Sequence, residues 1–375
     1  MKKIFLITIL TVLFISCSGG GNNISAINNN LSSGDNNGSD TDADNGNGGL
    51  TSNAPGWLIP FSEVVDGGTG KDGIPSIDNP VFTSVSSSKN NYLKNDDLVV
   101  GIIKNGDTRA YPYTILNWHE NVNDDFNGDP ITISYCPLTG TAFAFESKSG
   151  GKETTFGESG LLYNNNLILY DRRTGTKWSQ LKLQAINGSL IRERLNLSNV
   201  VETDWKTWKT LYPNSKVLSK DTGFDRSYNV YPYGNYLDKQ NFFYFPLSPL
   251  NNALPNKERV YAVLSDSESI VYRFQNFQNG KALKQNFDTK NYLVVGNGKL
   301  INSFELNSSQ KLLNFSYNSN NPLDFFTDDE GNIWSIFGKA ISGPRTGEVL
   351  KGAKSVVSYW FAVAAFYPNP IISTD

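Results

Sequence analysis

The sequence has little of the residues that most often carry reactive chemistry. Among 375 residues there is one histidine, His119, and there are two cysteines, Cys17 and Cys136. His-Glu-x-x-His, paired Cys-x-x-Cys and glycine-rich phosphate-loop motifs are absent. The chain therefore lacks the standard metalloprotease, dithiol and phosphate-loop sites, and any reactive imidazole or thiol must come from these few residues.

Charged side chains are also scarce. They make up 18% of the chain, the net charge is −3, and no block of basic residues occurs. Proteins that bind nucleic acid meet the phosphates with clustered lysine and arginine. The composition therefore excludes a nucleic-acid partner.

The long apolar run lies at the N-terminus, in MKKIFLITILTVLFISC. Two lysines precede an apolar segment that is too short for an ordinary membrane span, and Cys17 follows the small residue Ser16. This pattern predicts a bacterial lipoprotein signal peptide over residues 1–16, with Cys17 lipidated as the first residue of the mature chain. An uncleaved anchor is the alternative. Both place the protein in the cell envelope, outside the inner membrane, with a membrane as its partner through Cys17.

Residues 17–56 consist mainly of Gly, Asn, Ser and Asp and offer almost nothing to bury. Such a segment cannot offset its ordering entropy, so we expect a disordered tether that reaches roughly 35 Å. The remaining body, residues 57–375, is rich in aromatic residues and long enough for one large or two ordinary domains.

Short strands dominate the body. Three hairpins are expected: Leu98 onward with a turn at Asn105-Gly106, Asp129 onward through the Pro-Leu-Thr-Gly turn, and Asn166 onward with a turn at Thr174-Gly175. TILNWHENV predicts one short helix, and TDWKTWKTLYP predicts another with Thr203 as its N-cap. The fold class is mainly β, hairpin-rich, with a few short helices.

Two segments of the body resemble each other. LVVGIIKNGDTRAYPYTIL aligns with RVYAVLSDSESIVYRFQNF, and Gly175-x-x-Trp178-Ser179 aligns with Gly331-x-x-Trp334-Ser335. We predict two tandem, diverged β-rich repeats packed as one body, residues 57–250 and 251–375. The second repeat contains no histidine and no cysteine, so the candidate site belongs to the first.

The candidate catalytic residues lie close together in the sequence. Cys136 ends a predicted strand, seventeen positions after His119. An imidazole near a thiol lowers the pKa of the thiol and activates it as a nucleophile, and Glu120 or Asn117 could orient the ring. Alternatively, Cys136 and His119 are ligands of copper or zinc, with a carboxylate such as Glu120 completing the site. A third possibility is that both residues are only packed in the core.

A second group of residues predicts a ligand site. Acidic, basic and aromatic side chains at strand ends could bind an anionic or sugar ligand. In the competing interpretation, Asp171 only caps the turn before Gly175. The candidates are Arg109, Tyr163, Asp171, Arg172, Trp178 and Gln180.

Several blocks, in order, resemble one bacterial family. They are DGIPSIDNPVF, RAYPYTILNWHENVND, YCPLTGTAFAF, TFGESGLLYNNNLILYDRRTGTKWSQ, SKDTGF and WFAVAAFYP, and they span roughly Asp66 to Pro368. The family is domain of unknown function 3179, uncharacterised exported proteins and lipoproteins. The resemblance implies no established activity. It also implies that many members have a second cysteine where this chain has Thr139, so a vicinal dithiol is not available here.

The sequence thus supports three functions: a thiol-dependent enzyme or metal centre at Cys136 and His119, a ligand- or glycan-binding module, and a structural lipoprotein. The small-molecule or protein partner is not identified by any motif. The spatial relation of Cys136 and His119 distinguishes these functions.

Overall fold

The computed structural model describes residues 56–319, 321 and 323–375. These residues belong to one compact unit, Leu50–Asp375. The expected signal peptide, Cys17 and nearly all of the expected tether lie outside the described residues. No helix within the described ranges is long and apolar enough to cross a membrane.

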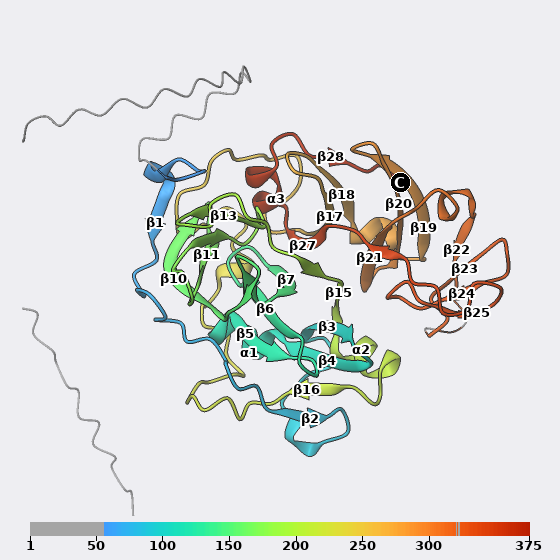
Figure 1. The fold of residues 1–375 in the computed structure, drawn as a ribbon, viewed down its shortest axis with the longest axis horizontal. Helices are drawn as coiled ribbons and strands as arrows, with labels where there is room; N and C mark the ends of the chain where they lie inside the picture. Colours follow the sequence, from blue (N-terminus) through green and yellow to red (C-terminus); the bar gives the residue numbers. More distant parts are fainter. Residues whose placement is uncertain (1–55, 320, 322) are drawn as a thin grey trace, which may run out of the picture. The chain divides into compact units, whose positions relative to one another are not determined.

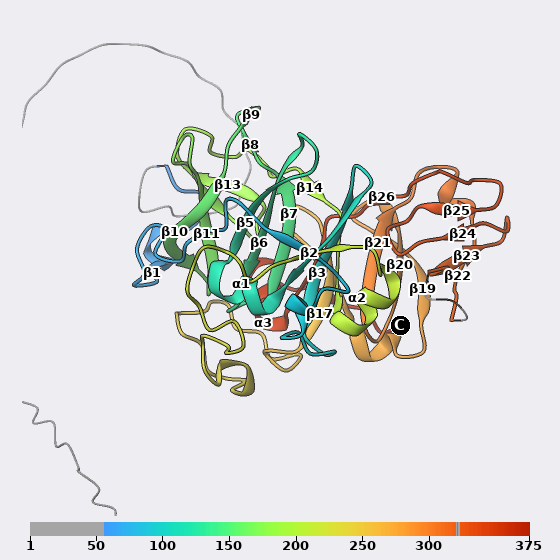
Figure 2. The same ribbon diagram turned by 90° about the horizontal axis from the view of Figure 1, so that it is seen from below.

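The described chain is mainly β, as predicted, and the strands of residues 57–250 form three larger sheets and one small hairpin (Figure 1). The first sheet has the order β1 (Val64–Asp66), β10 (Phe156–Tyr163), β11 (Asn166–Asp171), β12 (Lys177–Ser179) and β13 (Gln184–Asn187). The second has the order β14 (Leu197–Ser198), β7 (Thr141–Glu146), β6 (Pro130–Cys136) and β5 (Asn121–Asp125). The third has the order β15 (Val200–Asp204), β3 (Leu98–Lys104), β4 (Asp107–Pro112), β16 (Lys216–Leu218) and β2 (Phe82–Ser84). The hairpin of β8 (Lys148–Ser149) and β9 (Lys152–Glu153) projects from this part (Figure 2).

The strands of residues 251–375 form three sheets of their own. The first has the order β27 (Ser355–Tyr359), β17 (Arg259–Leu264), β18 (Ser269–Arg273) and β28 (Ile371–Ile372). The second has the order β19 (Lys281–Phe287), β20 (Lys290–Asn297), β21 (Leu300–Glu305) and β26 (Lys351–Gly352). The third, β22 (Phe315–Tyr317), β23 (Phe326–Asp328), β24 (Ile333–Trp334) and β25 (Ala340–Ser342), lies beside β19 in Figures 1 and 2.

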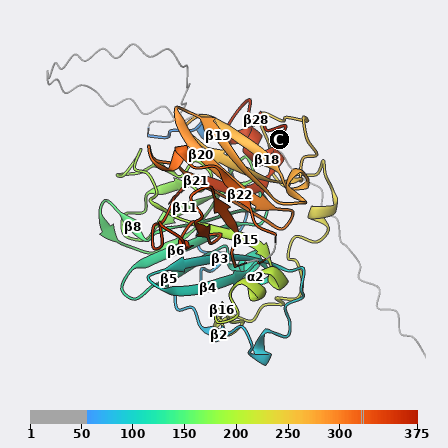
Figure 3. The ribbon, with the colours of Figure 1, turned by 90° about the vertical axis from the view of Figure 1, so that its right-hand side faces the viewer.

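Short helices connect the sheets. The α-helices are α1 (Tyr113–His119), α2 (Trp205–Leu211) and α3 (Trp360–Phe366). The 3-10 helices are η1 (Phe61–Glu63), η2 (Ser88–Asn90), η3 (Tyr236–Asp238), η4 (Phe274–Phe277) and η5 (Gln310–Leu312). Figure 3 shows α2 and β15 next to β3, in agreement with their contacts.

The three predicted hairpins are confirmed. β3 and β4 join at Asn105 and Gly106, whose φ angles are +52° and +77°. Positive φ at both central residues matches the right-handed twist of the two strands, and Asn-Gly tolerates it. The β6–β7 and β11–β12 pairs also form where the sequence places them.

Both predicted helices form, but the N-cap prediction for α2 was wrong. Asp204, not Thr203, precedes the helix, and its carboxylate accepts a hydrogen bond from the backbone N–H of Thr207 at 2.7 Å. Thr203 is still inside β15, where it pairs with Val99. One residue decides the cap because only the residue directly before the first turn can reach its free N–H groups.

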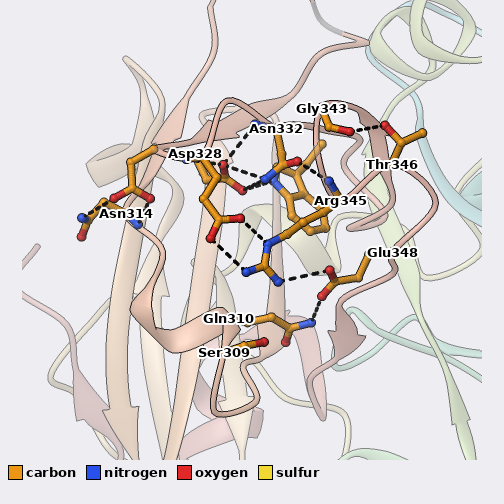
Figure 4. Close-up of polar contacts among 12 residues, drawn as sticks. Ser309, Gln310, Asn314, Asp328, Asn332, Gly343, Arg345, Thr346 and Glu348 are labelled. Carbon is orange, nitrogen blue, oxygen red and sulfur yellow. Dashed lines mark hydrogen bonds and ion pairs between the residues drawn. The ribbon is translucent and has the colours of Figure 1, made fainter.

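The two parts share a strand order and a local motif. In both, an antiparallel hairpin (β3–β4, β17–β18) lies between an antiparallel strand and a parallel strand. Asp171 accepts a hydrogen bond from the indole N–H of Trp178 at 3.1 Å, and Asp328 accepts one from Trp334 at 2.8 Å. Figure 4 shows Asp328 and its partner Asn332. The similar sequences around Trp178 and Trp334 thus form the same Asp–Trp turn in both parts. The duplication of the chain stays a prediction.

The two parts pack together through apolar side chains. One core cluster contains Cys136 and Phe143 from the first part and Tyr359 and Trp360 from the second. The backbone N–H of Tyr359 donates to the carbonyl of Thr139 at 2.8 Å. An irregular stretch, residues 219–258, connects the two parts and carries the tyrosines that cover the cavity described next.

Candidate functional site

A mainly apolar cavity of about 320 Å³ lies in the first part. Its walls come from the loop after β1, the end of α1, the end of β6, strand β10 and the 219–258 segment. It is lined by Gly67, Thr69, Ile74, Glu120, Cys136, Leu138, Glu158, Gly160, Leu161, Leu162, Leu167, Pro232, Tyr233, Tyr244 and Phe245. A concave apolar site with a few convergent polar groups is the usual form of a small-molecule site.

Glu120 is held at the C-terminal end of α1. Its backbone N–H donates to the carbonyl of Leu116 at 2.8 Å, and its carbonyl accepts from Tyr135 N–H at 2.7 Å. Its φ angle is +55°, a conformation that residues other than glycine rarely adopt and that costs free energy. The hydroxyl of Tyr233 donates to the carboxylate at 2.9 Å. The helix end and the adjacent strand together aim this side chain into the cavity.

Glu158 reaches the same cavity from β10, where the pairing with β11 shifts between Glu158 and Leu161. Asn121 donates from its side chain to the Glu158 carboxyl. The irregularity brings β10 so close to the loop after β1 that a Cβ on Gly160 would lie 2.6 Å from the backbone of Gly70. Gly160 also has a φ angle of +80°. The close approach to Gly70 and the positive φ angle therefore both require glycine at position 160.

The Glu120 and Glu158 carboxyl groups lie in hydrogen-bonding contact with each other. Only 5% of Glu120 and 4% of Glu158 is exposed. Burial raises the pKa of Glu120 to about 7, and burial together with the neighbouring Glu120 charge raises the pKa of Glu158 well above its ordinary value. Two carboxyls in contact cannot both ionise cheaply. Protonation of the pair is therefore favoured by burial and by the contact between the two carboxyls, and the pKa of Glu158 is raised by both causes.

Cys136 lines the cavity beside this pair. Its thiol is buried and donates a weak hydrogen bond to the carbonyl of Asn165 at 3.5 Å. Burial, reinforced by Glu120, raises the pKa of Cys136 to about 12. The hydroxyl of Thr139 is in hydrogen-bonding contact with the thiol. Cys136 is therefore a neutral thiol in this state.

His119 does not contact Cys136 through either ring nitrogen. Nδ1 is 2.8 Å from the carbonyl oxygen of Pro75, and Nε2 is 2.7 Å from the hydroxyl of Tyr228. The side chain is fully buried, and desolvation lowers its pKa. The structure thus gives His119 two other partners, and a nucleophilic role for Cys136 activated by His119 stays a prediction.

Asn117 lies in a neighbouring cavity of about 250 Å³, with Trp118 and Arg226. Ile74, Pro232 and Tyr233 line both this cavity and the one that contains Glu120. For the copper or zinc alternative, within the described ranges no three His, Cys, Asp or Glu side chains are grouped so that they could hold a metal ion. The metal alternative stays a prediction.

Arg109, predicted to bind a ligand, is buried in the core. It pairs with Asp107 and with Asp124, each at 2.6 Å. Its guanidinium also lies over the rings of Phe82 and Phe126. All these contacts are internal, and they hold β4 against its neighbours.

The other predicted ligand-binding residues do not line the cavity either. Asp171 holds its turn, where it accepts from Thr174 N–H at 2.7 Å and from Trp178. Arg172 pairs with Asp78 at 2.8 Å.

Tyr163, Trp178 and Gln180 are buried. The ring of Tyr163 packs edge-to-face on Phe366, and burial raises the pKa of its hydroxyl to about 12. The amide of Gln180 bonds to the hydroxyls of Ser134 and Thr141 at 3.0 and 2.7 Å. These residues build the scaffold around the cavity and do not face a ligand in it.

Sequence reasoning named Cys136 and Glu120 but missed Glu158 and Tyr233. Glu158 stands in FGESGLLY, an otherwise apolar strand, between two glycines. A lone acidic residue flanked by small residues inside a strand is a usable signal, because it marks close approach of another backbone. Tyr233 has no such signal, since only the path of the connecting segment brings it to Glu120.

No curated protein and no solved structure matched the chain. A family model did match, and it covers both carboxyls, the two Asp–Trp turns and all of the cavity lining except Gly67 and Thr69. The family is described as Protein of unknown function (DUF3179), the match spans residues 71–370, and the chain therefore belongs to that family.

Proposed function

We propose that this protein is an envelope enzyme that transfers protons to and from a small, mainly apolar substrate in the Glu120–Glu158 cavity. The observation that carries the proposal is the contact of two buried carboxyls at the wall of an apolar cavity. Buried carboxyls without such a role are usually paired with a base, and perturbed acids in cavities favour catalytic sites.

Each residue has a distinct part in this proposal. Ionised Glu120 is the general base, because its pKa of about 7 leaves a reactive carboxylate at neutral pH. Protonated Glu158 is the general acid or hydrogen-bond donor. The Tyr233 hydroxyl orients Glu120. The leucines of the wall exclude water and strengthen every electrostatic interaction inside.

Cys136 has a second, smaller part. Because the thiol is neutral, it can donate a weak hydrogen bond to a bound molecule or respond to oxidation. A nucleophilic role for Cys136 would need a base beside the thiol; the ring nitrogens of His119 bond to Pro75 and Tyr228, and Glu120 is a carboxyl group in the same cavity.

The location proposed for this activity follows from the N-terminal sequence. Lipidated Cys17 would anchor the protein to a membrane outside the inner membrane, and the 17–56 tether would let the body move about its anchor. The similar strand order of the two parts, with β1 and β2 as extra strands of the first, supports an origin by duplication, after which only the first part carries the site.

A binding module without chemistry is the second candidate. The observation that favours it is the lining itself, because apolar side chains of Leu, Ile, Phe and Pro supply much of the wall. Such a site could hold a ligand and release it unchanged.

An activity screen separates the two. The full-length protein in detergent is incubated with a small-molecule extract, and loss or gain of compounds is followed by mass spectrometry. We expect turnover by the parent and by the control Glu153→Gln, which changes an exposed carboxyl, and none by Glu120→Gln. Cys136→Ser should stay within about 1–2 kcal/mol of parent stability. Compounds retained but never converted would support the binding module, and equal turnover by Glu120→Gln would refute the acid–base role.

A further inference from the structure

The carboxyl pair lacks a positive partner, unlike other buried acids in the chain. Asp124 pairs with Arg109 at 2.6 Å, and the buried Glu202 lies 3.6 Å from Arg259. In the part of the chain that the structure describes, neither Glu120 nor Glu158 forms an ion pair, and the lining of their cavity contains no lysine, arginine or histidine. A buried carboxylate without a counter-charge is costly, so the site favours a ligand that brings one.

The mature chain outside the described residues offers no such cation from its side chains. Residues 17–55 contain no lysine, arginine or histidine. A positive charge at the carboxyl pair would therefore come from another molecule.

The aromatic part of the cavity lining suits a cation with an apolar body. Tyr233, Tyr244 and Phe245 bring aromatic rings to the cavity from one segment, with the first two ring centroids 6.1 Å apart. The same segment already holds a cation on a ring, because Lys257 Nζ lies 3.3 Å from the ring centroid of Tyr236. Aromatic faces attract ammonium groups, and Leu138 and Leu167 provide apolar surface.

From these contacts we propose that the cavity binds a small organic amine, its ammonium group against Glu120 and Glu158 and its apolar body against the leucines and aromatic rings. This inference rests on the proposed site, though not on its catalytic activity. A volume of about 320 Å³ is at the small end of ligand cavities, which suits a single short chain or ring system. Anionic ligands are excluded by like charge.

The proton balance of binding follows from the pair. When an ammonium ion enters, the shared proton of the pair leaves to solvent, and two carboxylates then face one ammonium group. When a neutral amine enters, it takes the shared proton and becomes the same ammonium ion. Binding at neutral pH should therefore release a proton in the first case and none in the second.

Calorimetry with matched ligands tests the inference. The full-length protein in detergent is titrated with butylamine, 2-phenylethylamine and tryptamine, and then with 2-phenylethanol and 3-phenylpropanoate. We expect at least one amine to bind roughly tenfold or more tighter than the alcohol, and no binding of the carboxylate. Repeating the titration in buffers of different ionisation enthalpy should show proton release.

Variants locate the effect. Glu158→Gln should weaken amine binding roughly tenfold while leaving alcohol binding unchanged, because only the charged ligand needs the second carboxylate. The control Glu153→Gln should bind as the parent does.

The outcomes separate this inference from the proposed activity. Amine binding without any turnover in the screen supports the ligand class and refutes the enzyme. Glu120-dependent turnover of a neutral or anionic compound, with no amine bound, refutes the ligand class and supports the enzyme. Failure of all three amines to bind, or equal affinity for amine and alcohol, overturns the inference.

Discussion

The first and second parts of the body order their strands alike, yet the positions that form the cavity differ. In the first part Phe156 pairs with Asp171, and Glu158 follows two residues later. In the second part Phe315 pairs with Asp328, and Tyr317 stands at the position that corresponds to Glu158. Tyr317 packs edge-to-face on Phe325, whereas Glu158 lines a cavity.

The second part also has a position that corresponds to Cys136. Phe145 of β7 and Glu305 of β21 each pair with the first residue of a short fourth strand, Leu197 and Lys351. Thr141 stands four residues before Phe145 and pairs with Cys136, and Ile301 stands four residues before Glu305 and pairs with Gly296. Gly296 therefore corresponds to Cys136. Gly296 brings no side chain, so the second part lacks the thiol as well as the acid.

The comparison separates architecture from chemistry. The Asp–Trp turn is present in both parts and is therefore a feature of the scaffold. The acid and the thiol are present in one part only, and a helix of seven residues, α1, brings Glu120 to them, whereas the second part has the shorter η4 after β18. Features that the parts share hold the fold, and features that differ mark the site.

The largest expected effect tests the shared architecture. Trp178→Ala and Trp334→Ala should each lower the free energy of unfolding by about 3–5 kcal/mol, because both side chains are fully buried and each substitution leaves a cavity and removes one hydrogen bond to the turn aspartate. Urea unfolding measures this. The control Leu312→Ala, at a 73% exposed position, should change stability by less than about 0.5 kcal/mol. If one of the two substitutions lowered the free energy of unfolding only slightly, the two Asp–Trp turns would not have the same structural role.

A smaller effect tests the difference between the parts. Since the pKa of Glu120 is raised to about 7 in the folded protein, the folded state binds more protons than the unfolded state between about pH 4.5 and pH 7. The contribution of Glu120 to the free energy of unfolding is therefore fully present below about pH 4.5. It decreases by on the order of 1–3 kcal/mol as the pH rises to about 7.

Glu120→Gln cannot ionise and should lack that slope. The measurement is the free energy of unfolding of parent minus variant at several pH values, with Glu153→Gln as the matched control. A parent and a Glu120→Gln variant with parallel pH profiles would contradict the raised pKa.

The smallest effect compares two helix starts. The carboxylate of Asp204 caps α2, whereas Tyr359 precedes α3 without a side-chain cap. Asp204→Ala should cost about 1 kcal/mol. The isosteric control Thr203→Val should be near neutral, because the Thr203 hydroxyl has no hydrogen-bond partner among the described residues. The unfolding temperature of each variant measures this. If Thr203 were the cap, Thr203→Val would lower that temperature more than Asp204→Ala.

The β class, the hairpins and the short helices were predictable because each depends on neighbours in the chain. Asn105-Gly106 permits the positive φ angles of its turn wherever the turn lies. The α2 cap was missed by one residue because Ser, Thr and Asp cap alike, and the boundary depends on where β15 stops pairing.

The candidate site was only half predictable. Cys136 and Glu120 were named because His and Cys are scarce in this chain, and scarcity drew attention to the right stretch. The same scarcity suggested a bond from His119 to Cys136, whereas the ring bonds to Pro75 and Tyr228. The directions in which His119 and Glu120 point depend on the geometry of α1 and its C-terminal end, and not on their closeness to Cys136 in the sequence.

By itself the sequence determined the local turns, the strand-rich class and the family, because these depend on residue type and short-range spacing. Tertiary structure alone decided that Glu120 and Glu158 touch and that Tyr233 joins them. It also decided that the cavity holds no cation of its own among the described residues. Burial, and with it the raised pKa of Glu120, arises only when strands and a connecting segment far apart in the chain exclude water from the same point.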